Sequence, residues 1–357
     1  MRTAVVVGGG IAGLAVAAGL TQRGRQVEVH ERAPEFTEVG AGISIWGNAL
    51  RALDALGLGD QVRARGARPD RGGFRDRRGR WLARSSGELV LIHRAELLEV
   101  LLSAVPAESL RPGSTVRDFP AADLLVGADG LHSTVRGAFW PEAAAPRYTG
   151  HTAWRMVLPA AGIPAFDGSE TWGDRQVFGV FPMTDGRIYA YAAAAAPAGT
   201  RSQSGELAEL RRRFAGWPAP IPSVLAAADR ADRHDLYYLP DLPTYVRGRV
   251  ALVGDAAHAM TPNLGQGGCQ ALEDAVTLAM VADDLPRYDA LRRRRSQSIA
   301  RRSRMVGRLV HGPGAPVRDA ALRLMPDGLF RRSLVSVLEW QPPGDGVVHR
   351  QDRSEPC

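Results

Sequence analysis

Lysine is absent from this sequence of 357 residues, so all 45 basic residues are arginine, which is typical of a compositional bias rather than of a function. Cysteine is scarce: Cys269 and Cys357 form neither a metal-binding pattern nor a disulfide framework. No apolar run approaches the roughly 20 residues that span a bilayer. The first residues already have the pattern of a strand, which leaves no room for a cleaved signal. We therefore expect a cytoplasmic protein with no membrane segment and no metal site.

The positive charge, +7 net with a pI near 10, raises the question of nucleic-acid binding. The denser arginine runs, at 75–80, 211–213 and 292–295, are not interleaved with aromatic residues, and no nucleic-acid-binding motif is present. The stretch Arg292–Arg304 has helical spacing with apolar residues on one side, which predicts a solvated basic face. We expect no nucleic-acid partner, although a positive surface attracts anionic cofactors and substrates.

The first 31 residues have the pattern of a strand, a glycine turn, a helix and a second strand. Thr3–Val7 is an apolar run that ends in Gly8-Gly9-Gly10-Ile11-Ala12-Gly13, and the second apolar run ends at Glu31. These glycines permit a tight turn, close approach of a pyrophosphate and close packing of helix on strand. The helix N-terminus favours phosphate, and the acid suits an adenosine ribose. The pattern predicts FAD or NAD, against the alternative of an ordinary glycine-rich turn.

Two further strand-to-helix turns narrow the choice of cofactor. One is Gly127-Ala128-Asp129-Gly130, followed by Ser133 and Arg136, in which the acid can cap the next helix. The other is Gly254-Asp255-Ala256-Ala257-His258, followed by Pro262 and the loop Gly265–Gly268. Its carboxylate can bind a ribityl hydroxyl, and the loop and helix start can stabilise the anionic edge of reduced flavin. Together the three turns predict FAD.

Between about residues 149 and 196, short extended runs bounded by Gly, Pro and Asp predict an antiparallel sheet. Its aromatic residues are candidates for an aromatic-binding pocket, with core packing as the alternative for most of them: Trp154, Trp172, Phe178, Phe181, Tyr189 and Tyr191. Arg155 either anchors a carboxylate or phenolate or points to solvent. His151 and His234 are candidate bases, although a lone histidine is more often structural.

The order of these patterns predicts an α/β protein with a discontinuous Rossmann-like FAD-binding domain, an inserted antiparallel β-sheet substrate domain and C-terminal helices. The expected boundaries are FAD-binding 1–70, substrate-domain strands 71–88, FAD-binding 89–148, substrate domain 149–245, FAD-binding 246–284, C-terminal helices 285–340 and a flexible tail 341–357.

With these three motifs in this order, the sequence resembles the single-component FAD-dependent aromatic hydroxylases typified by para-hydroxybenzoate hydroxylase, and especially salicylate- and urate-hydroxylase-like members. The resemblance covers about residues 1–304. It places Pro262 beside the reactive face of the flavin, and with Arg155 and Tyr191 of the predicted sheet this residue is a candidate for catalysis. It also implies the following cofactor contacts: Gly8, Gly10, Ala12, Gly13, Glu31, Arg32, Ser44, Arg94, Val116, Asp129, Asp255, Pro262, Gly265, Gln266, Gly267, Gly268 and Cys269.

The resemblance also implies the chemistry. NADH or NADPH would reduce FAD transiently, and reduced flavin would react with O2 to form a C4a-hydroperoxide that hydroxylates a small aromatic or heteroaromatic substrate. The partner would be that substrate, and the protein a monomer or homodimer. Only residues 117–123 separate Val116 from the next strand, so a family hairpin is largely missing here.

Three other functions remain open on the sequence. An epoxidase or a reductase would have the same fold but would form an epoxide or a hydrogenated product instead of a hydroxylated one. A halogenase is disfavoured, because Trp154–Pro159 lacks the second tryptophan of the halogenase signature. A flavin-binding interaction protein without turnover is the most distant alternative, motivated only by the basic balance.

Overall fold

The computed structural model describes residues 2–37, 41–69, 71–85 and 88–344. Among these residues, a six-stranded sheet has the order β14-β15-β8-β1-β2-β7. Its strand pairs are parallel, apart from the antiparallel edge pair β14–β15. The strands are β1 (Thr3–Val7), β2 (Gln26–His30), β7 (Leu110–Arg111), β8 (Leu124–Gly127), β14 (Val246–Arg247) and β15 (Val250–Leu252).

The central strands of this sheet read as continuous apolar runs because helices cover them. α1 and α9 pack against each other, and α1 is rich in Ala and Gly, which allows this close contact. The helical elements of this part are α1 (Ile11–Gln22), α2 (Gly47–Ala55), α3 (Gly59–Arg65), α4 (Arg94–Leu102), η1 (Ala107–Ser109), α5 (Thr134–Phe139), α8 (Asp255–His258), η2 (Pro262–Leu264) and α9 (Gly267–Met280).

A seven-stranded sheet has the order β13-β9-β12-β11-β10-β4-β5, antiparallel except for the parallel pair β10–β4. Its even-numbered residues on β9, such as Trp154 and Met156, pack under α6 (Glu206–Arg213) and α7 (Ile221–Ala227), while the odd-numbered residues face the opposite way. The strands are β4 (Gly72–Asp76), β5 (Trp81–Ser85), β9 (Arg147–Pro159), β10 (Gly168–Trp172), β11 (Gln176–Pro182), β12 (Arg187–Ala195) and β13 (Asp232–Tyr238).

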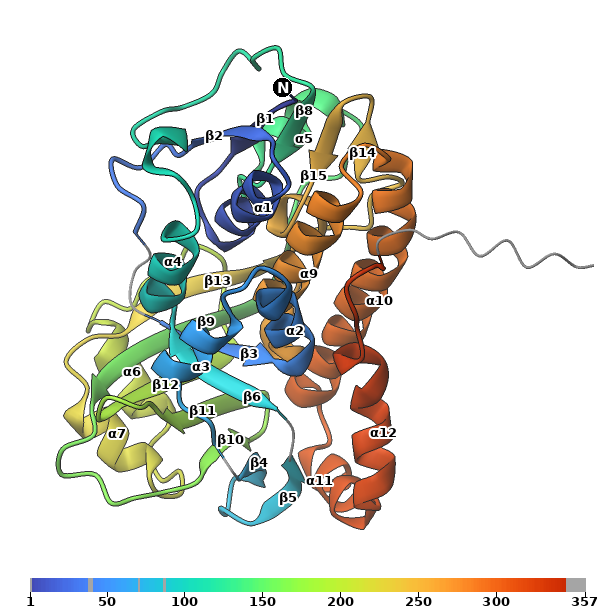
Figure 1. Cartoon of the computed structure of the whole chain (residues 1–357). Coiled ribbons are helices and arrows are strands. Elements are labelled where there is room, and N and C mark those ends of the chain that lie inside the picture. The colour runs from blue at the N-terminus through green and yellow to red at the C-terminus, as the bar shows by residue number, and fades with distance from the viewer. Residues whose placement is uncertain (1, 38–40, 70, 86–87, 345–357) are drawn as a thin grey trace, which may run out of the picture.

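A two-stranded ribbon of β3 (Gly42–Trp46) and β6 (Leu89–His93) lies between the two sheets (Figure 1). Three C-terminal helices follow: α10 (Leu285–His311), α11 (Ala315–Leu324) and α12 (Asp327–Leu338). α10 contacts both α9 and β11, so it runs along both parts of the molecule. No helix in the described part of the chain has the length and apolar character needed to cross a membrane.

The predicted fold class is confirmed: a Rossmann-like parallel sheet is combined with a second, largely antiparallel sheet and C-terminal helices. Helix α3 and the elements α7 and β13 were not predicted, because glycine, arginine and proline obscure their periodicity. Val116 lies in a loop instead of a strand. The residues Val39 and Gly40 and most of the expected tail lie outside the described residues, and the domain boundaries stay a prediction.

Candidate active site

Three turns meet at the carboxyl ends of the neighbouring strands β1, β8 and β15. A Cβ atom on Gly8, whose φ is +109°, would lie 2.3 Å from the carbonyl oxygen of Ala128. A Cβ atom on Gly254 would lie 2.9 Å from the Cβ of Ala12 at the start of α1. The three glycine-containing motifs are therefore packed against one another, at the sheet edge where α/β proteins bind their ligands.

The glycine turn after β1 uses each glycine differently. A Cβ atom on Gly13 would lie 1.9 Å from the carbonyl oxygen of Gly8, so this glycine allows the helix to pack on the turn. A Cβ atom on Gly10 would meet nothing within 4 Å, and Gly10 caps α1 without any side-chain hydrogen bond. The space beside Gly10 at this helix start is therefore open and no side chain caps it, as an anion site requires.

Glu31 lies beside this turn, where the sequence predicts it. Its carboxylate accepts hydrogen bonds from the N–H groups of Gly9 (2.7 Å) and Ala33 (2.9 Å). Each carboxylate oxygen has a second acceptor site, so both remain able to accept from a ribose hydroxyl. The neighbouring Arg32 is exposed. At the end of β15, Asp255 is also exposed at the first position of α8.

The loop before α9 packs on strand β3. A Cβ atom on Gly265 would lie 3.1 Å from Nε1 of Trp46 and 4.0 Å from the Cβ of Ser44. Gln266 caps α9 without a side-chain hydrogen bond, and a Cβ on Gly267 would meet nothing within 4 Å. The start of α9 thus presents backbone N–H groups beside β3, which resembles the start of α1.

Several buried polar atoms around these turns lack a hydrogen-bond partner among the described residues. They are Trp46 Nε1, Asn48 Oδ1, Asp129 Oδ1, His258 Nδ1 and Gln266 Nε2. Buried polar groups are normally paired, and a polar ligand at these turns would supply the partners that the protein does not. A dinucleotide that carries a polar ring fits these features. Its phosphates and ring would meet the uncapped starts of α1 and α9, and its hydroxyl groups the exposed Asp255 and the unpaired atoms.

A group of buried charges supports the turn at Gly254, and we call His258, Glu273, Asp274 and Arg292 the buried ion cluster. Arg292 NH1 pairs with Glu273, and its Nε lies 2.7 Å from Asp274 Oδ1. Burial acts to raise the pKa of Glu273 and Asp274. The charges of Arg292 and Arg295 outweigh burial at Glu273, and those of His258 and Arg292 outweigh it at Asp274, so both pKa values fall below the usual range. Both carboxylates therefore remain ionised.

The second sheet contributes one row of side chains to the side that faces β3. In strand register, Glu170 is opposite Gly179, Gly179 is opposite Tyr191, and Tyr191 is opposite Arg155. We call these four residues the Glu170–Arg155 row. Tyr189 lies on the same face, and a Cβ atom on Gly42 of β3 would lie 2.5 Å from its Cγ. The row therefore faces the ribbon that also carries Ser44 and Trp46.

Positive charge gathers at one end of this row. Burial raises the pKa of Tyr189, and the charges of Arg155 and Arg94 oppose that effect. Burial lowers the pKa of His234, and Arg155 adds to that lowering. Arg155 and Arg94, the first residue of α4, therefore both lie close enough to Tyr189 and His234 for their charges to act on these groups.

Two predicted pocket residues are not on this face. Trp154 and Phe178 are fully buried with α6 and α7, so the prediction that they line a substrate pocket is wrong. They alternate with the residues that do face the ribbon, and strand alternation without a known register cannot show which set faces the core. Trp172, Phe181, Tyr189 and Tyr191 lie on the ribbon side.

Three residues that the sequence predicts to contact the cofactor have other structural roles or positions. Asp129 caps α5 through hydrogen bonds from Thr134 N (2.6 Å) and Val135 N (3.1 Å), which occupy its Oδ2. Cys269 is fully buried, and burial raises the pKa of its thiol to about 12. Val116 is partly buried against the main core in a loop after β7.

Sequence reasoning missed several residues of the site. Arg292 was assigned to a solvated face, yet it is completely buried. Its position four residues after the buried Tyr288 places it on the apolar side of the helix, and that spacing is a signal for burial. Glu170 and Asn48 were not singled out, because isolated polar residues carry no motif.

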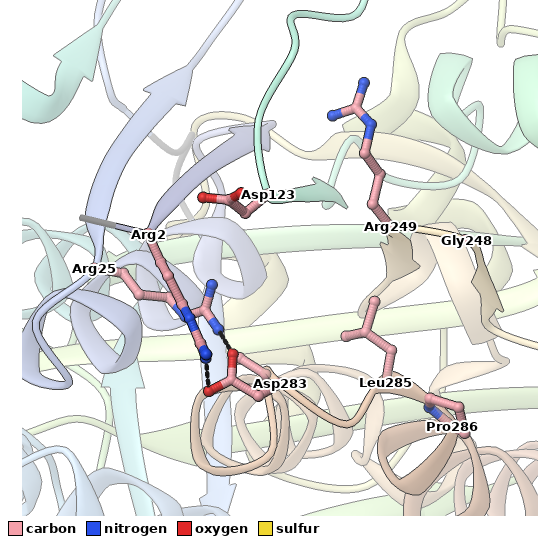
Figure 2. Close-up of a pocket in the computed structure, with 9 residues that line it drawn as sticks. Arg2, Arg25, Asp123, Gly248, Arg249, Asp283, Leu285 and Pro286 are labelled. Atoms are coloured by element: carbon pink, nitrogen blue, oxygen red, sulfur yellow. Dashed lines mark hydrogen bonds and ion pairs between the residues drawn. The ribbon is translucent and has the colours of Figure 1, made fainter.

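A pocket of about 400 Å³ lies at the opposite edge of the six-stranded sheet (Figure 2). It is lined by residues that precede the strands, among them Arg2, Arg25 and Asp123, and Arg2 and Arg25 both pair with Asp283. Parallel sheets bind ligands at the other edge, so we do not assign the active site here. No cluster able to hold a metal ion occurs within the described ranges.

Comparisons with known proteins agree with this geometry. A family model described as an FAD binding domain matches residues 104–282, and one described as an NAD(P)-binding Rossmann-like domain matches residues 6–38. The chain is 37% identical to aurachin C monooxygenase/isomerase of Stigmatella aurantiaca, over 93% of this chain and 97% of that protein. It is 34% identical to 3-amino-4-hydroxybenzoate 2-monooxygenase of Streptomyces cremeus, over 90% and 92% of the two chains.

Among solved structures, Klebsiella pneumoniae HpxO in complex with FAD and uric acid superimposes with a TM-score of 0.86 at 29% identity. The superposition covers 94% of this chain and 96% of that one. The chain therefore belongs to the single-component FAD-dependent aromatic hydroxylases and is an FAD-dependent monooxygenase.

Proposed function

We propose that this monooxygenase uses NADH or NADPH and O2 to hydroxylate a small aromatic or heteroaromatic compound. The observation that carries the proposal is the contact of the three turns at one sheet edge, beside the ribbon that the Glu170–Arg155 row faces. When bound, FAD would accept a hydride from the nicotinamide and then activate O2 for insertion of one oxygen atom. The protein supplies binding, orientation and exclusion of water.

The first turn would hold the pyrophosphate and the adenosine. Backbone N–H groups at the start of α1 would meet the phosphates, since nothing fills the space at Gly10. Glu31 would accept from the ribose, with Arg32 beside the adenosine. The remaining family contacts in this half are assigned by resemblance: Gly8, Ala12, Gly13, Arg94, Val116 and Asp129.

The third turn would hold the ribityl chain and the ring. Asp255 is exposed and ready to accept from a hydroxyl, and the start of α9 would lie at the ring edge where reduced flavin carries negative charge. Cys269 would contribute through its backbone, because its side chain is buried. The other residues proposed around the ring are Ser44, Pro262, Gly265, Gln266, Gly267 and Gly268.

The substrate would lie between this loop and the second sheet. Tyr189, Tyr191, Phe181 and Trp172 provide aromatic surface on the ribbon side. Arg155 provides the positive charge that would anchor a carboxylate or an oxyanion. Relatives named for 3-amino-4-hydroxybenzoate and for urate hydroxylation support a polar aromatic ring as substrate.

The test is a screen of phenolic and heteroaromatic compounds with FAD-loaded protein. We expect one class to accelerate NADH or NADPH oxidation and to yield a product heavier by one oxygen atom that derives from 18O2. Addition of oxygen across an aliphatic double bond would indicate an epoxidase, and hydrogenated product without O2 consumption a reductase. FAD-loaded protein that never oxidises NADH or NADPH would contradict the proposal and favour a flavin-binding protein without turnover.

A further inference from the structure

The carboxylate of Glu170 receives hydrogen bonds from two aromatic side chains on the ribbon side of the second sheet. Tyr191 donates its hydroxyl to Oε2, and Trp172 donates its indole N–H to Oε1. Glu170 and Trp172 are two residues apart on β10, so both side chains leave the strand on one face. Tyr191 reaches Glu170 from β12, across the intervening strand β11.

Glycine on the intervening strand makes this contact geometrically possible. A Cβ atom on Gly179 would lie 2.4 Å from both Cε1 and Cζ of Tyr191, so the tyrosine ring lies directly over this position. The ring is further held by Phe181, whose plane lies at 14° to it with the centroids 6.0 Å apart. The direction of the Tyr191 hydroxyl is thus fixed by packing as well as by its hydrogen bond.

The direction of these hydrogen bonds determines what Tyr191 offers to a ligand. An indole N–H is only a donor, so Glu170 Oε1 must be an acceptor. A tyrosine hydroxyl has a single proton, and here that proton is directed to the other oxygen of Glu170. Any other group that approaches the oxygen of Tyr191 therefore meets only lone pairs.

Burial raises the pKa of Glu170, and the hydrogen bonds from Tyr191 and Trp172 oppose this by stabilising the charged form. Burial and the adjacent Glu170 raise the pKa of Tyr191 well above its usual value, which keeps the phenol protonated. The hydrogen bond thus runs from a neutral tyrosine to Oε2 of Glu170, whose pKa burial keeps above its usual value.

We propose that Tyr191, oriented by Glu170, accepts a hydrogen bond from a ring O–H or N–H group of the substrate, while Arg155 takes an oxygen acceptor or anion of the same ring. The inference rests on the proposed function and narrows its substrate class. The substrate is an aromatic ring with a hydrogen-bond donor and a separate carbonyl, carboxylate or oxyanion, such as a hydroxybenzoate or a 4(1H)-quinolone. Glu170 is a positioning residue, and Tyr191 contacts the substrate.

The test compares compounds with and without the donor. Dissociation constants are measured from flavin fluorescence for 3-hydroxybenzoate against 3-methoxybenzoate, and for 4(1H)-quinolone against 1-methyl-4-quinolone, on FAD-loaded protein. We expect at least one pair to favour the donor compound by tenfold or more, because a site that pairs with O–H or N–H rejects the analogue lacking it. Tyr191→Phe should reduce that preference at least tenfold.

Glu170→Gln is the decisive variant. The amide oxygen can still accept from Trp172, while its NH2 group donates to Tyr191 and turns the tyrosine proton toward the ligand. The preference for the compound with the O–H or N–H donor should therefore fall as far as in Tyr191→Phe. The glutamine has nearly the shape of Glu170, and Tyr191 is unchanged, so the loss cannot come from altered packing. Glu206→Gln is the matched control, since Glu206 accepts from Trp154 Nε1 at 2.6 Å on the opposite face of the same sheet. Its preference should equal that of the unaltered protein.

Flavin content and melting temperature show whether each variant is folded. If the unaltered protein oxidises neither NADH nor NADPH, the proposed function is contradicted, whatever its preference between the paired compounds. FAD-loaded protein that binds none of the four compounds, that binds both members of each pair equally, or that keeps its preference in Glu170→Gln would overturn this inference alone.

Discussion

His258 Nε2 lies 2.5 Å from Oδ2 of Asp274, and both side chains are closed to solvent. The same carboxylate oxygen accepts the backbone N–H of Gly254 at 2.9 Å. One buried acid therefore fixes the turn that leads into Asp255, and Arg292 compensates its charge. The geometry of this turn depends on electrostatic balance as well as on apolar packing.

Replacing Arg292 with methionine should strongly destabilise the protein, because the buried Glu273 would keep only Arg295 and the buried Asp274 only His258 as an ion partner. Loss of one partner in a buried ion pair costs about 3–5 kcal/mol. Chemical denaturation measures this directly. The control is Arg294→Met, which alters an exposed arginine on the same helix and should change the free energy of unfolding by less than about 0.5 kcal/mol. Equal effects of the two variants would contradict a supporting role for the buried ion cluster.

Gly10 and Gly13 should respond differently to alanine. In Gly13→Ala the new Cβ meets the backbone oxygen of Gly8, and such overpacking costs about 1–3 kcal/mol even without cofactor. In Gly10→Ala the Cβ enters open space at a φ of −79°, so the FAD-free protein should keep its stability within about 1 kcal/mol. Its FAD affinity should nevertheless fall at least tenfold, because the methyl group occupies the proposed phosphate site. Titration with FAD and thermal melts of the FAD-free forms distinguish the two. A Gly10→Ala protein with unchanged FAD affinity would refute the assignment of that site.

The stability of the protein should decrease in mild acid through His311. Its ring lies against that of His151, with the centroids 4.2 Å apart and the planes tilted by 36°. Burial, with the neighbouring His151, lowers the pKa of His311 to about 4. A histidine in the unfolded chain binds its proton near pH 6.5, so the unfolded state gains protons first as the pH falls. This contribution is fully present above pH 6.5 and is lost between about pH 6.5 and 4, at no more than about 1.4 kcal/mol per pH unit.

Denaturation midpoints between pH 4 and 8 test this dependence. His311→Asn should have a shallower decline than the unaltered protein, whereas the exposed His132→Asn should follow the original curve. An unchanged slope in His311→Asn would show that other groups cause the decline.

Cys269 should resist alkylation while the protein is folded. The thiolate is the reactive form, and burial holds the pKa of this thiol near 12 with no exposed surface. In a Cys357→Ser variant, iodoacetamide at pH 8 should leave the folded protein unmodified and label it fully in guanidinium. Rapid labelling of the folded form would mean that the start of α9 opens readily.

The turns and the strands that lead into them were predictable because their signals are local. At Asp129 and Asp255, strand, glycine and acid follow one another within a few residues, and at Gly8 the strand runs directly into three glycines. Backbone conformation restricts which residues can occupy such turns. The partners of Glu170 and Arg292 were not predictable in this way. Glu170 meets Tyr191 only after three strands are placed in register, and Arg292 meets Asp274 only after two helices pack. Residues of these types have no characteristic spacing in sequence, so their pairing depends on tertiary structure.

Gly42 has one further consequence. Strand β3 separates the loop before α9 from the phenol ring of Tyr189, and at Gly42 it presents only backbone to that ring. A larger residue at this position would collide with the ring of Tyr189 and would force that ring, or the strand that carries it, away from β3. The distance between strand β3 and the second sheet at this point therefore depends on the absence of a side chain at Gly42.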